Sequence, residues 1–247
     1  MTIKQLVIGV TLFFMPTPLA RFILCFCKSV HIASTARIGF SLVIADKITM
    51  SDGAKIGHLN LVKCRTLNMG EDSHIKKVNI IKGVYDVSLA NQAVINHSNT
   101  IVNSLNIPSL NQAFTIPELK IGYNSIIGVK HFLDMTANIT IGENSILAGR
   151  SSELWTHAFY HQHTGSGRYM IRGAINIGNN CYIGSHVIFN CGVSVADTAT
   201  VAAGAIVSKD IVRGGVYCAQ PLRRIDFDPD EAVRKFKRID EYHYEKE

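Results

Sequence analysis

The sequence predicts an all-β solenoid, in which short parallel strands stack in successive coils. From Ile32 to Val62 an aliphatic side chain recurs at every sixth position. Six is not a multiple of 3.6, so a helix would spread these side chains around its circumference. Short strands separated by turns can instead direct each of them inward. Three units of six then close one triangular coil, and stacked coils join their inward side chains into one core.

The same period returns twice farther along the chain. It slips by two residues after Leu133, and it is interrupted once more before Ile177. The aliphatic positions are Ile32, Ile38, Ile44, Met50, Ile56, Val62, Ile121, Ile127, Leu133, Ile141, Leu147, Ile177, Ile183, Phe189, Val195, Val201 and Val207. Small or β-branched residues often fill the fifth position of a unit, as at Ala36, Ala54, Ser125, Ser145, Val187, Val193, Ala199 and Ala205.

The phase is irregular between Lys63 and Leu119. Met69, Ile75, Leu89 and Ile95 still fit units of six, so we expect the same solenoid there with irregular loops. The segment 103–117 has no clean period and is expected to leave the solenoid.

Turn chemistry agrees with this fold. A glycine often follows the aliphatic residue, and we expect it to supply a positive φ, which costs little only for Gly, Asn or Asp. The turn positions also hold asparagines, namely Asn124, Asn144, Asn179 and Asn180. We interpret these asparagines as turn formers rather than ligands.

Composition limits the class of protein. The chain has 247 residues, of which 47% are apolar and only 18% charged, which excludes a disordered chain. The net charge is +6, but the basic residues are scattered, so we expect no nucleic-acid partner. An anionic ligand or an acidic membrane surface remains compatible with this charge. The six cysteines form no CxxC pair, and we expect them to be reduced.

The chain divides into three parts. Residues 1–29 form an apolar segment with runs at 6–15 and 22–27, which are too short to span a bilayer and lack a good signal-peptide cleavage site. This segment either packs on the protein or contacts a membrane peripherally. Residues 30–225 form the β-helix, with a loop over 150–174. Residues 226–247 predict a helix that begins near Pro229 and caps the last coil.

The runs 175–188 and 201–211, Ile-Asn-Ile-Gly-Asn-Asn-Cys-Tyr-Ile-Gly-Ser-His-Val-Ile and Val-Ala-Ala-Gly-Ala-Ile-Val-Ser-Lys-Asp-Ile, carry a resemblance. They resemble the hexapeptide-repeat acyltransferases, and most closely the sugar O-acetyltransferases of the galactoside and maltose type. The resemblance implies a left-handed parallel β-helix, a homotrimer, acetyl-CoA as donor, and active sites between neighbouring subunits.

The interruption at 150–174 holds the candidate catalytic residues. In the similar transferases a histidine that follows Thr at the exit of the coil is the catalytic base, and Thr156-His157 occupies that place. A neutral imidazole can take the proton of a sugar hydroxyl as the oxygen attacks a thioester. Asp134 and Glu153 compete for two roles, orienting this imidazole and binding the acceptor sugar.

Other side chains are candidates for acceptor binding. The two-residue slip could turn His131 towards the groove, and Trp155 can either stack on a sugar or anchor the loop. His161 and His163 are interpreted as solvated loop residues. Together with His157 they also raise the question of zinc, because γ-class carbonic anhydrases share this coil. Their H-x4-H pair is missing here, so we expect no metal.

The resemblance also implies a donor site. Ser185, Ala203, Ser208 and Lys209 match positions that line coenzyme A in the family. Arg223 and Arg224 would meet its phosphates, or they merely cover the last coil.

The sequence therefore predicts an acetyl-CoA-dependent O-acetyltransferase that acts on a sugar hydroxyl, of a surface polysaccharide or its precursor. We expect a cytoplasmic protein, at the inner face of the membrane if residues 1–29 bind lipid. The alternatives are an acetyltransferase for a small soluble acceptor, such as an antibiotic, an amino acid or a nucleotide sugar, and a non-enzymatic β-helix assembly protein.

Overall fold

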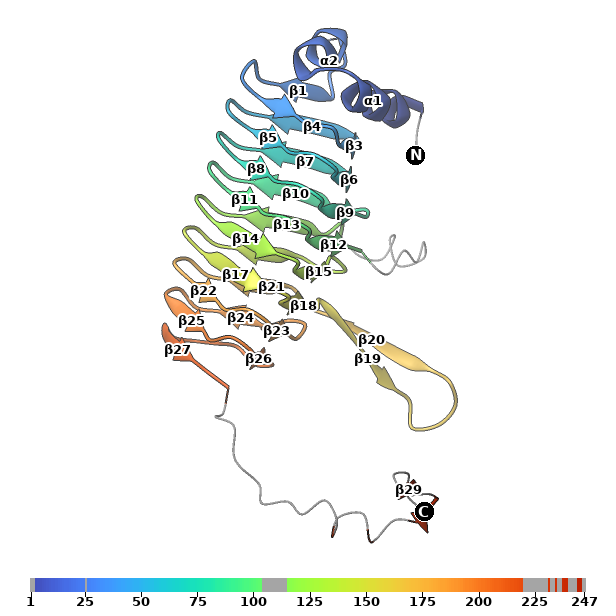
Figure 1. The fold of residues 1–247 in the computed structure, drawn as a ribbon, viewed down its shortest axis with the longest axis vertical. Coiled ribbons are helices and arrows are strands. Elements are labelled where there is room, and N and C mark those ends of the chain that lie inside the picture. Colours follow the sequence, from blue (N-terminus) through green and yellow to red (C-terminus); the bar gives the residue numbers. More distant parts are fainter. Residues whose placement is uncertain are drawn as a thin grey trace.

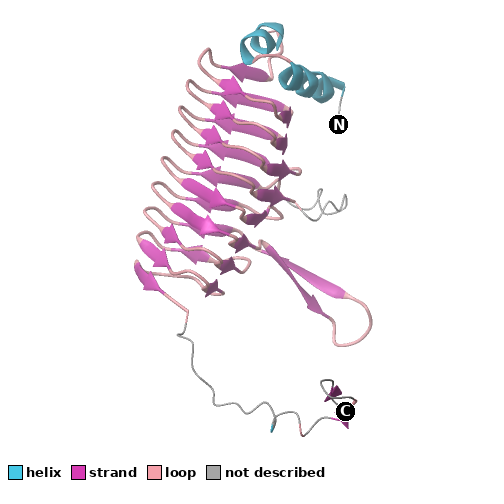
Figure 2. Cartoon of the chain, in the orientation of Figure 1, coloured by secondary structure: helices cyan, strands magenta, loops and turns pink. Residues whose placement is uncertain are grey.

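The computed structural model describes residues 3–24, 26–103, 115–219, 231, 234, 237–239 and 244–245. Two helices are followed by a left-handed parallel β-helix of about nine coils, and a hairpin projects from it (Figure 1). Apart from that hairpin, the strands of the coils form three parallel sheets, one on each face (Figure 2). The predicted fold class is confirmed.

Each coil contributes one strand to each sheet. Sheet A contains β1 (Val30–Ile32), β4 (Lys47–Met50), β7 (Thr66–Met69), β10 (Asp86–Leu89), β13 (Glu118–Ile121), β16 (Ile139–Ile141), β21 (Ile175–Ile177) and β24 (Ser194–Val195). Sheet B contains β2 (Arg37–Ile38), β5 (Lys55–Ile56), β8 (His74–Ile75), β11 (Val94–Ile95), β14 (Ile126–Val129), β17 (Ile146–Arg150), β22 (Tyr182–Ile183), β25 (Ala199–Val201) and β27 (Gly215–Tyr217). Sheet C contains β3 (Leu42–Ile44), β6 (Leu61–Lys63), β9 (Ile80–Lys82), β12 (Thr100–Val102), β15 (Phe132–Asp134), β18 (Glu153–Leu154), β23 (Ile188–Phe189) and β26 (Ile206–Val207).

The core is the inward column of aliphatic side chains on each sheet. Strands pair in register from coil to coil, so that Met50 lies between Ile32 and Met69. All the predicted aliphatic positions are buried, and so are the small residues at the fifth positions. One assignment differs: Val43, not Ile44, is in register with Val62, and Ile44 lies close to Gly9 of the first helix.

The corner between sheets C and A, here called the CA corner, contains most of the phase irregularities. In a regular unit the next inward residue follows after six positions, but Met69 follows Val62 by seven and Ile141 follows Leu133 by eight. The segment 103–117 and the hairpin are also inserted between a strand of sheet C and a strand of sheet A. Between Lys63 and Leu119 the other two corners keep the spacing of six, so the irregular phase there comes from this corner. The corner between sheets B and C departs from six elsewhere, since Leu154 follows Leu147 by seven.

The corner between sheets B and C, the BC corner, contains a buried ladder of polar side chains. Asn60 Oδ1 accepts hydrogen bonds from the backbone and side-chain N–H groups of Asn79 at 2.8 and 3.1 Å. Asn79 Oδ1 accepts the same pair from Asn99 at 2.9 and 3.1 Å. All three asparagines are buried. The ladder satisfies polar groups that would be costly if left unpaired in the core.

The glycines that follow the aliphatic residues have a different role from the predicted one. Gly122 and Gly142 do not have positive φ. A Cβ atom on Gly122 would lie 2.5 Å from the carbonyl of Gly142 in the next coil, so these glycines permit close stacking of the turns. The asparagine prediction is confirmed at Asn124, Asn144 and Asn180, whose φ angles are 51°, 52° and 55°.

Helices α1 (Ile3–Phe14) and α2 (Thr17–Leu24) cover the first coil. Ile8 and Leu12 are buried. The Thr17 hydroxyl accepts a hydrogen bond from the N–H of Ile38 at 2.8 Å and donates one to its carbonyl at 3.1 Å. One face of the apolar N-terminal segment thus packs on the protein. None of the helices in the described ranges is long and apolar enough to cross a membrane.

The helix predicted over 226–247 falls mostly outside the described residues, and it stays a prediction. Of the residues described there, Lys237–Arg238 (β28) pair with Tyr244–Glu245 (β29) as antiparallel strands.

Replacing Asn79 by Ala is expected to lower the free energy of unfolding by about 3 kcal/mol, because two N–H donors of Asn99 lose their buried acceptor. Urea denaturation measures this loss. The exposed Asn190→Ala is the matched control and should change stability by less than about 0.5 kcal/mol. Equal effects of the two substitutions would contradict the role of the ladder.

Candidate active site

His157 and Asp134 meet at the CA corner. Asp134 is the last residue of β15, and His157 begins β19 (His157–His161) directly after the next strand of sheet C, β18. The Nδ1 atom of His157 lies 2.6 Å from Oδ2 of Asp134. The side chain of Asp134 is completely buried, whereas that of His157 is 11% exposed. The pair predicted from sequence is therefore present, with the imidazole at the surface and the carboxylate beneath it.

The surroundings of Asp134 determine the tautomer of His157. Thr136 donates its hydroxyl to Oδ1 at 2.8 Å. The N–H and the hydroxyl of Thr156 lie 3.2 and 2.8 Å from Oδ2. The Thr156 oxygen itself accepts the N–H of Ala137 at 2.9 Å, so the hydroxyl proton is directed to Asp134. Because a carboxylate only accepts, Nδ1 of His157 donates to it and Nε2 keeps a free lone pair.

The two extra residues after Leu133 make this arrangement. They lengthen the turn between Asp134 and β16, so that Thr136 can fold back onto the Asp134 carboxylate. Sequence reasoning used the slip but missed Thr136. The sequence feature that could have identified Thr136 is a hydroxyl two residues after the carboxylate, a spacing typical of local side-chain hydrogen bonds in turns.

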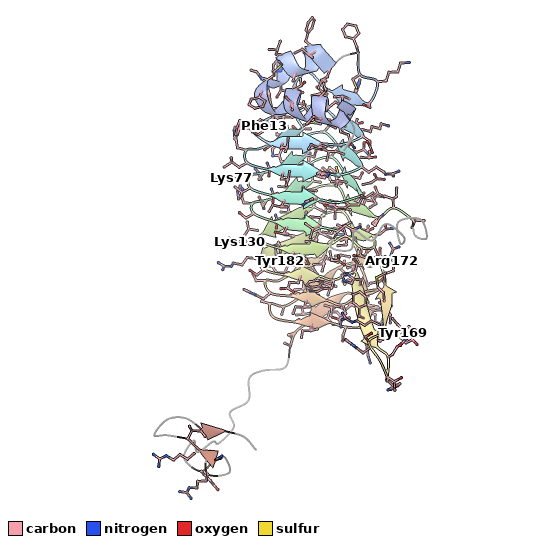
Figure 3. All side chains as sticks on the ribbon, turned by 90° about the vertical axis from the view of Figure 1, so that its right-hand side faces the viewer. Phe13, Lys77, Lys130, Tyr169, Arg172 and Tyr182 are labelled. Carbon is pink, nitrogen blue, oxygen red and sulfur yellow. The ribbon has the colours of Figure 1, made fainter. Side chains whose placement is uncertain are left out.

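Arg172 is a second residue that sequence reasoning missed. Strand β20 (Arg168–Arg172) pairs with β19 in a hairpin, and the register places Arg172 opposite His157. Figure 3 labels Arg172 near the base of this hairpin. Burial lowers the pKa of Arg172, and the negative charge of Asp134 opposes that shift. The guanidinium is thus close enough to Asp134 to stabilise its charge. Only the hairpin register brings Arg172 here, and no sequence pattern indicated it.

The loop predicted over 150–174 is shorter than expected and is mostly not a loop. Glu153 and Leu154 form strand β18 inside sheet C, and Leu154 is buried. Residues 157–172 form the projecting hairpin (Figure 1). Leu154 continues the inward column of sheet C, which is why the chain completes its coil before it leaves the solenoid.

Glu153 and Trp155 lie beside His157 and contact each other. The indole N–H of Trp155 donates to Glu153 at 2.9 Å, and its ring packs on Phe132 with centroids 4.7 Å apart. The rings of Trp155 and Phe159 stand edge-on to the imidazole, at 6.3 and 5.5 Å. Asp134, not Glu153, contacts the imidazole. Glu153 and Trp155 are the half-buried groups next to His157.

The structure does not bring His131 to this site. Its side chain is 1% exposed and extends the BC-corner ladder. The His131 N–H donates to Asn99 Oδ1 at 2.9 Å, and its Nδ1 accepts the N–H of Ser152 at 3.0 Å. The expectation that the slip turns His131 outward was wrong, because the slip follows Leu133 and leaves the preceding corner in phase.

The predicted donor residues lie at two corners. Ser185 is half-buried and Ala203 exposed, and both belong to turns of the BC corner. Ser208 and Lys209 are exposed after β26 and line a cavity of about 300 Å³, which Tyr217 and Cys218 also line. Arg223 and Arg224 fall outside the described residues. One chain therefore places Ser185 and Ala203 on the opposite edge of sheet C from His157.

His161 and His163 are exposed on the hairpin, as predicted. Within the part of the chain that the structure describes, no three His, Cys, Asp or Glu side chains are close enough to share a metal ion.

The buried position of His131 predicts an acid-dependent loss of stability. Burial lowers the pKa of His131 from 6.5 to about 4, partly opposed by backbone groups of Ser152, Leu147 and Gly149. The unfolded chain therefore takes up a proton below pH 6.5 that the folded chain refuses until about pH 4. The contribution of neutral His131 to the free energy of unfolding is therefore fully present above pH 6.5. It decreases by about 3 kcal/mol as the pH falls from 6.5 to 4.

His131→Asn should remove most of this pH dependence, because Asn continues the ladder without titrating. Urea midpoints at pH 7.5 and pH 4.5 measure it, with the exposed His163→Asn as control. If the wild type and His131→Asn lose the same stability between these two pH values, another group is responsible.

Comparisons with known proteins bear on the fold and on the family resemblance. No protein-family model matches the chain. Galactoside O-acetyltransferase of Escherichia coli (strain K12) is 34% identical over 110 residues, which are 44% of this chain and 50% of that protein. The chain thus spans half the length of this relative. A structure of UDP-N-acetylglucosamine acyltransferase matches 74% of this chain and 66% of its own, with a TM-score of 0.50 and 17% identity, and shares the fold.

A structure of galactoside acetyltransferase in complex with coenzyme A is 32% identical and covers 50% of this chain and 61% of its own, with a TM-score of 0.38. The sequence match to galactoside O-acetyltransferase confirms the predicted resemblance: over 44% of its length the chain is similar to the hexapeptide-repeat sugar O-acetyltransferases.

Proposed function

We propose that this protein is an acetyl-CoA-dependent O-acetyltransferase that acts on a sugar hydroxyl. The observation that carries the proposal is the 2.6 Å contact between a surface imidazole and a fully buried carboxylate at the CA corner. Burying a carboxylate costs free energy unless hydrogen bonds or an opposite charge compensate it. Buried, hydrogen-bonded carboxylates beside an imidazole are typical of functional sites. The similarity to galactoside O-acetyltransferase supports the same reaction.

His157 acts as the general base. Its Nε2 removes the proton of the acceptor hydroxyl while the oxygen forms a bond to the thioester carbonyl carbon. The carbon–sulfur bond then breaks, and the imidazolium returns the proton to the departing sulfur. Asp134 stays ionised, holds Nδ1–H in place and stabilises the transient positive charge on the ring. No covalent acyl-enzyme is needed.

The acceptor is proposed to lie against Glu153 and Trp155. Both are half-buried beside His157, and together they offer a carboxylate and an aromatic face, which suit sugar hydroxyls and the apolar face of a pyranose. The hairpin that begins at His157 projects from the solenoid (Figure 1) and offers further surface to a large acceptor. A surface polysaccharide or its precursor is therefore proposed as the acceptor.

The donor site is proposed to be shared between copies of the chain. Ser185 and Ala203 lie at one edge of sheet C and His157 at the other, so a complete site forms when the BC corner of one copy faces the CA corner of the next. Three such contacts close a homotrimer. Ser208, Lys209, Arg223 and Arg224 are proposed to bind the donor as well, the basic side chains through its phosphates.

Replacing His157 by Ala should lower the rate of acetyl transfer about 10²- to 10⁴-fold, because the general base is lost, while acetyl-CoA affinity stays nearly unchanged. Labelled acetyl-CoA with a panel of polysaccharides, lipid-linked sugars and nucleotide sugars measures the rate and identifies the acceptor. His161→Ala on the same hairpin is the control and should keep the wild-type rate. A wild-type rate in the His157 variant would refute the assignment.

Asp134→Asn should lower kcat about 100-fold and leave the acceptor KM nearly unchanged. The Asn amide can donate to Nδ1, which places the remaining ring proton on Nε2 and disables the base. Because Asp134 is fully buried, it has no direct contact with an acceptor. A raised acceptor KM with unchanged kcat would instead assign Asp134 to sugar binding.

A further inference from the structure

Helices α1 and α2 have a second apolar face, which points away from the solenoid. Helix α1 buries Ile8 and Leu12 against the first coil, whereas Leu6, Val7, Val10 and Phe14 are exposed. In α2, Ala20 and Leu24 are buried, whereas apolar side chains on the other side of the helix are exposed. The exposed apolar residues are Leu6, Val7, Val10, Phe14, Met15, Leu19, Phe22, Ile23, Phe26 and Phe40.

The aromatic side chains at the end of this face are unusually exposed for apolar residues. Phe22 is 72% and Phe26 91% exposed. The helices lie at the end of the solenoid, beyond β1 (Figure 1). Phe13, labelled in Figure 3, packs on Phe40 with ring centroids 4.2 Å apart. Contiguous apolar patches of this kind usually mark an interaction surface rather than ordinary solvent-exposed protein.

The charge around this face is mainly positive. The sequence has no Asp or Glu before Asp46, whereas Lys4, Arg21, Lys28 and Arg37 precede it. Asp46 accepts a hydrogen bond from Gln5 of α1 at 2.7 Å, so a single carboxylate stands against these four basic residues. An apolar surface with this excess of positive charge fits an anionic lipid surface better than a second copy.

A cavity next to α2 strengthens this choice. It has a volume of about 220 Å³ and is lined by Arg21, Leu24, Val30, His31 and Ile32. Among the described residues, Arg21 has no hydrogen bond or ion pair, so its guanidinium can bind phosphate oxygens.

We propose that the outer face of α1 and α2 binds the surface of a bilayer that contains anionic phospholipids, with Phe22 and Phe26 inserted at the interface and Arg21 and Lys28 against lipid phosphates. With 12 and 8 residues, the helices lie in the interface and do not cross the bilayer. This proposal is independent of the chemistry at His157.

Vesicle flotation of the full chain tests it. The wild type should float with phosphatidylcholine vesicles that contain about one third phosphatidylglycerol, and bind pure phosphatidylcholine more weakly. The double substitution Phe22→Ser, Phe26→Ser should lower the affinity at least about tenfold, because both side chains are exposed and lose only the lipid contact. Val212→Ser, Val216→Ser, which removes exposed apolar side chains after the last coil, is the matched control and should bind like the wild type.

A second variant separates charge from apolar insertion. Arg21→Gln, Lys28→Gln should lower affinity for the anionic vesicles roughly 30-fold, at about 1 kcal/mol per charge, and should leave binding to pure phosphatidylcholine unchanged. Thermal unfolding confirms that each variant is folded, and turnover of a soluble acceptor should be unaffected.

The proposal is overturned if the wild type does not float with anionic vesicles. It is also overturned if the Phe variant binds vesicles normally but changes the oligomeric mass in light scattering, because the face would then bind a second copy. If neither the wild type nor His157→Ala transfers acetyl groups while both bind vesicles, only the proposed acetyltransferase function is refuted.

Discussion

The structure depends on one constraint, the in-register pairing of each coil with the next. Strand pairing fixes the spacing between coils at about 4.8 Å and aligns equivalent residues along the axis. The inward aliphatic columns, the asparagine ladder and the stacked glycine turns all follow from this alignment. So does the candidate site, because Asp134 and His157 come from neighbouring coils and meet only when β15 and β18 are in register.

The same constraint explains where the fold can vary. The BC corner holds the buried ladder and has one extra residue between Leu147 and Leu154, where the register with β14 shifts. A residue inserted between sheets A and B would shift the stacked glycines. The CA corner has neither, so it accepts the extra residues after Val62 and Leu133 and the entire hairpin of residues 157–172. The irregular corner is therefore also the one at which polar side chains can be gathered for chemistry.

The period of six predicted the coils and the core because inward residues must repeat at the strand spacing. The slip and the interruption marked the segments that hold Asp134 and His157, and the resemblance to the sugar O-acetyltransferases selected His157 within its segment. The period of six could not predict which corner the extra residues enter, and this caused the wrong orientation of His131 and the overlong loop. Thr136 and Arg172 were missed for a related reason, since turn and hairpin conformations bring them to Asp134 and no periodic pattern indicates them. The glycines were recognised, but for backbone freedom rather than for the lack of a Cβ atom.

Coil stacking also makes this protein a molecular ruler. In sheet C the strand before His157, β18, is five strands from β3 of the first coil, which corresponds to about 24 Å along the axis. The height of the imidazole above the helical cap is set by the number of coils and not by any flexible segment. Deleting or duplicating one whole coil between Met50 and Ile101 would move that height in steps of about 4.8 Å and leave both ends intact. The length of an acceptor anchored at the cap would then have to change in the same steps.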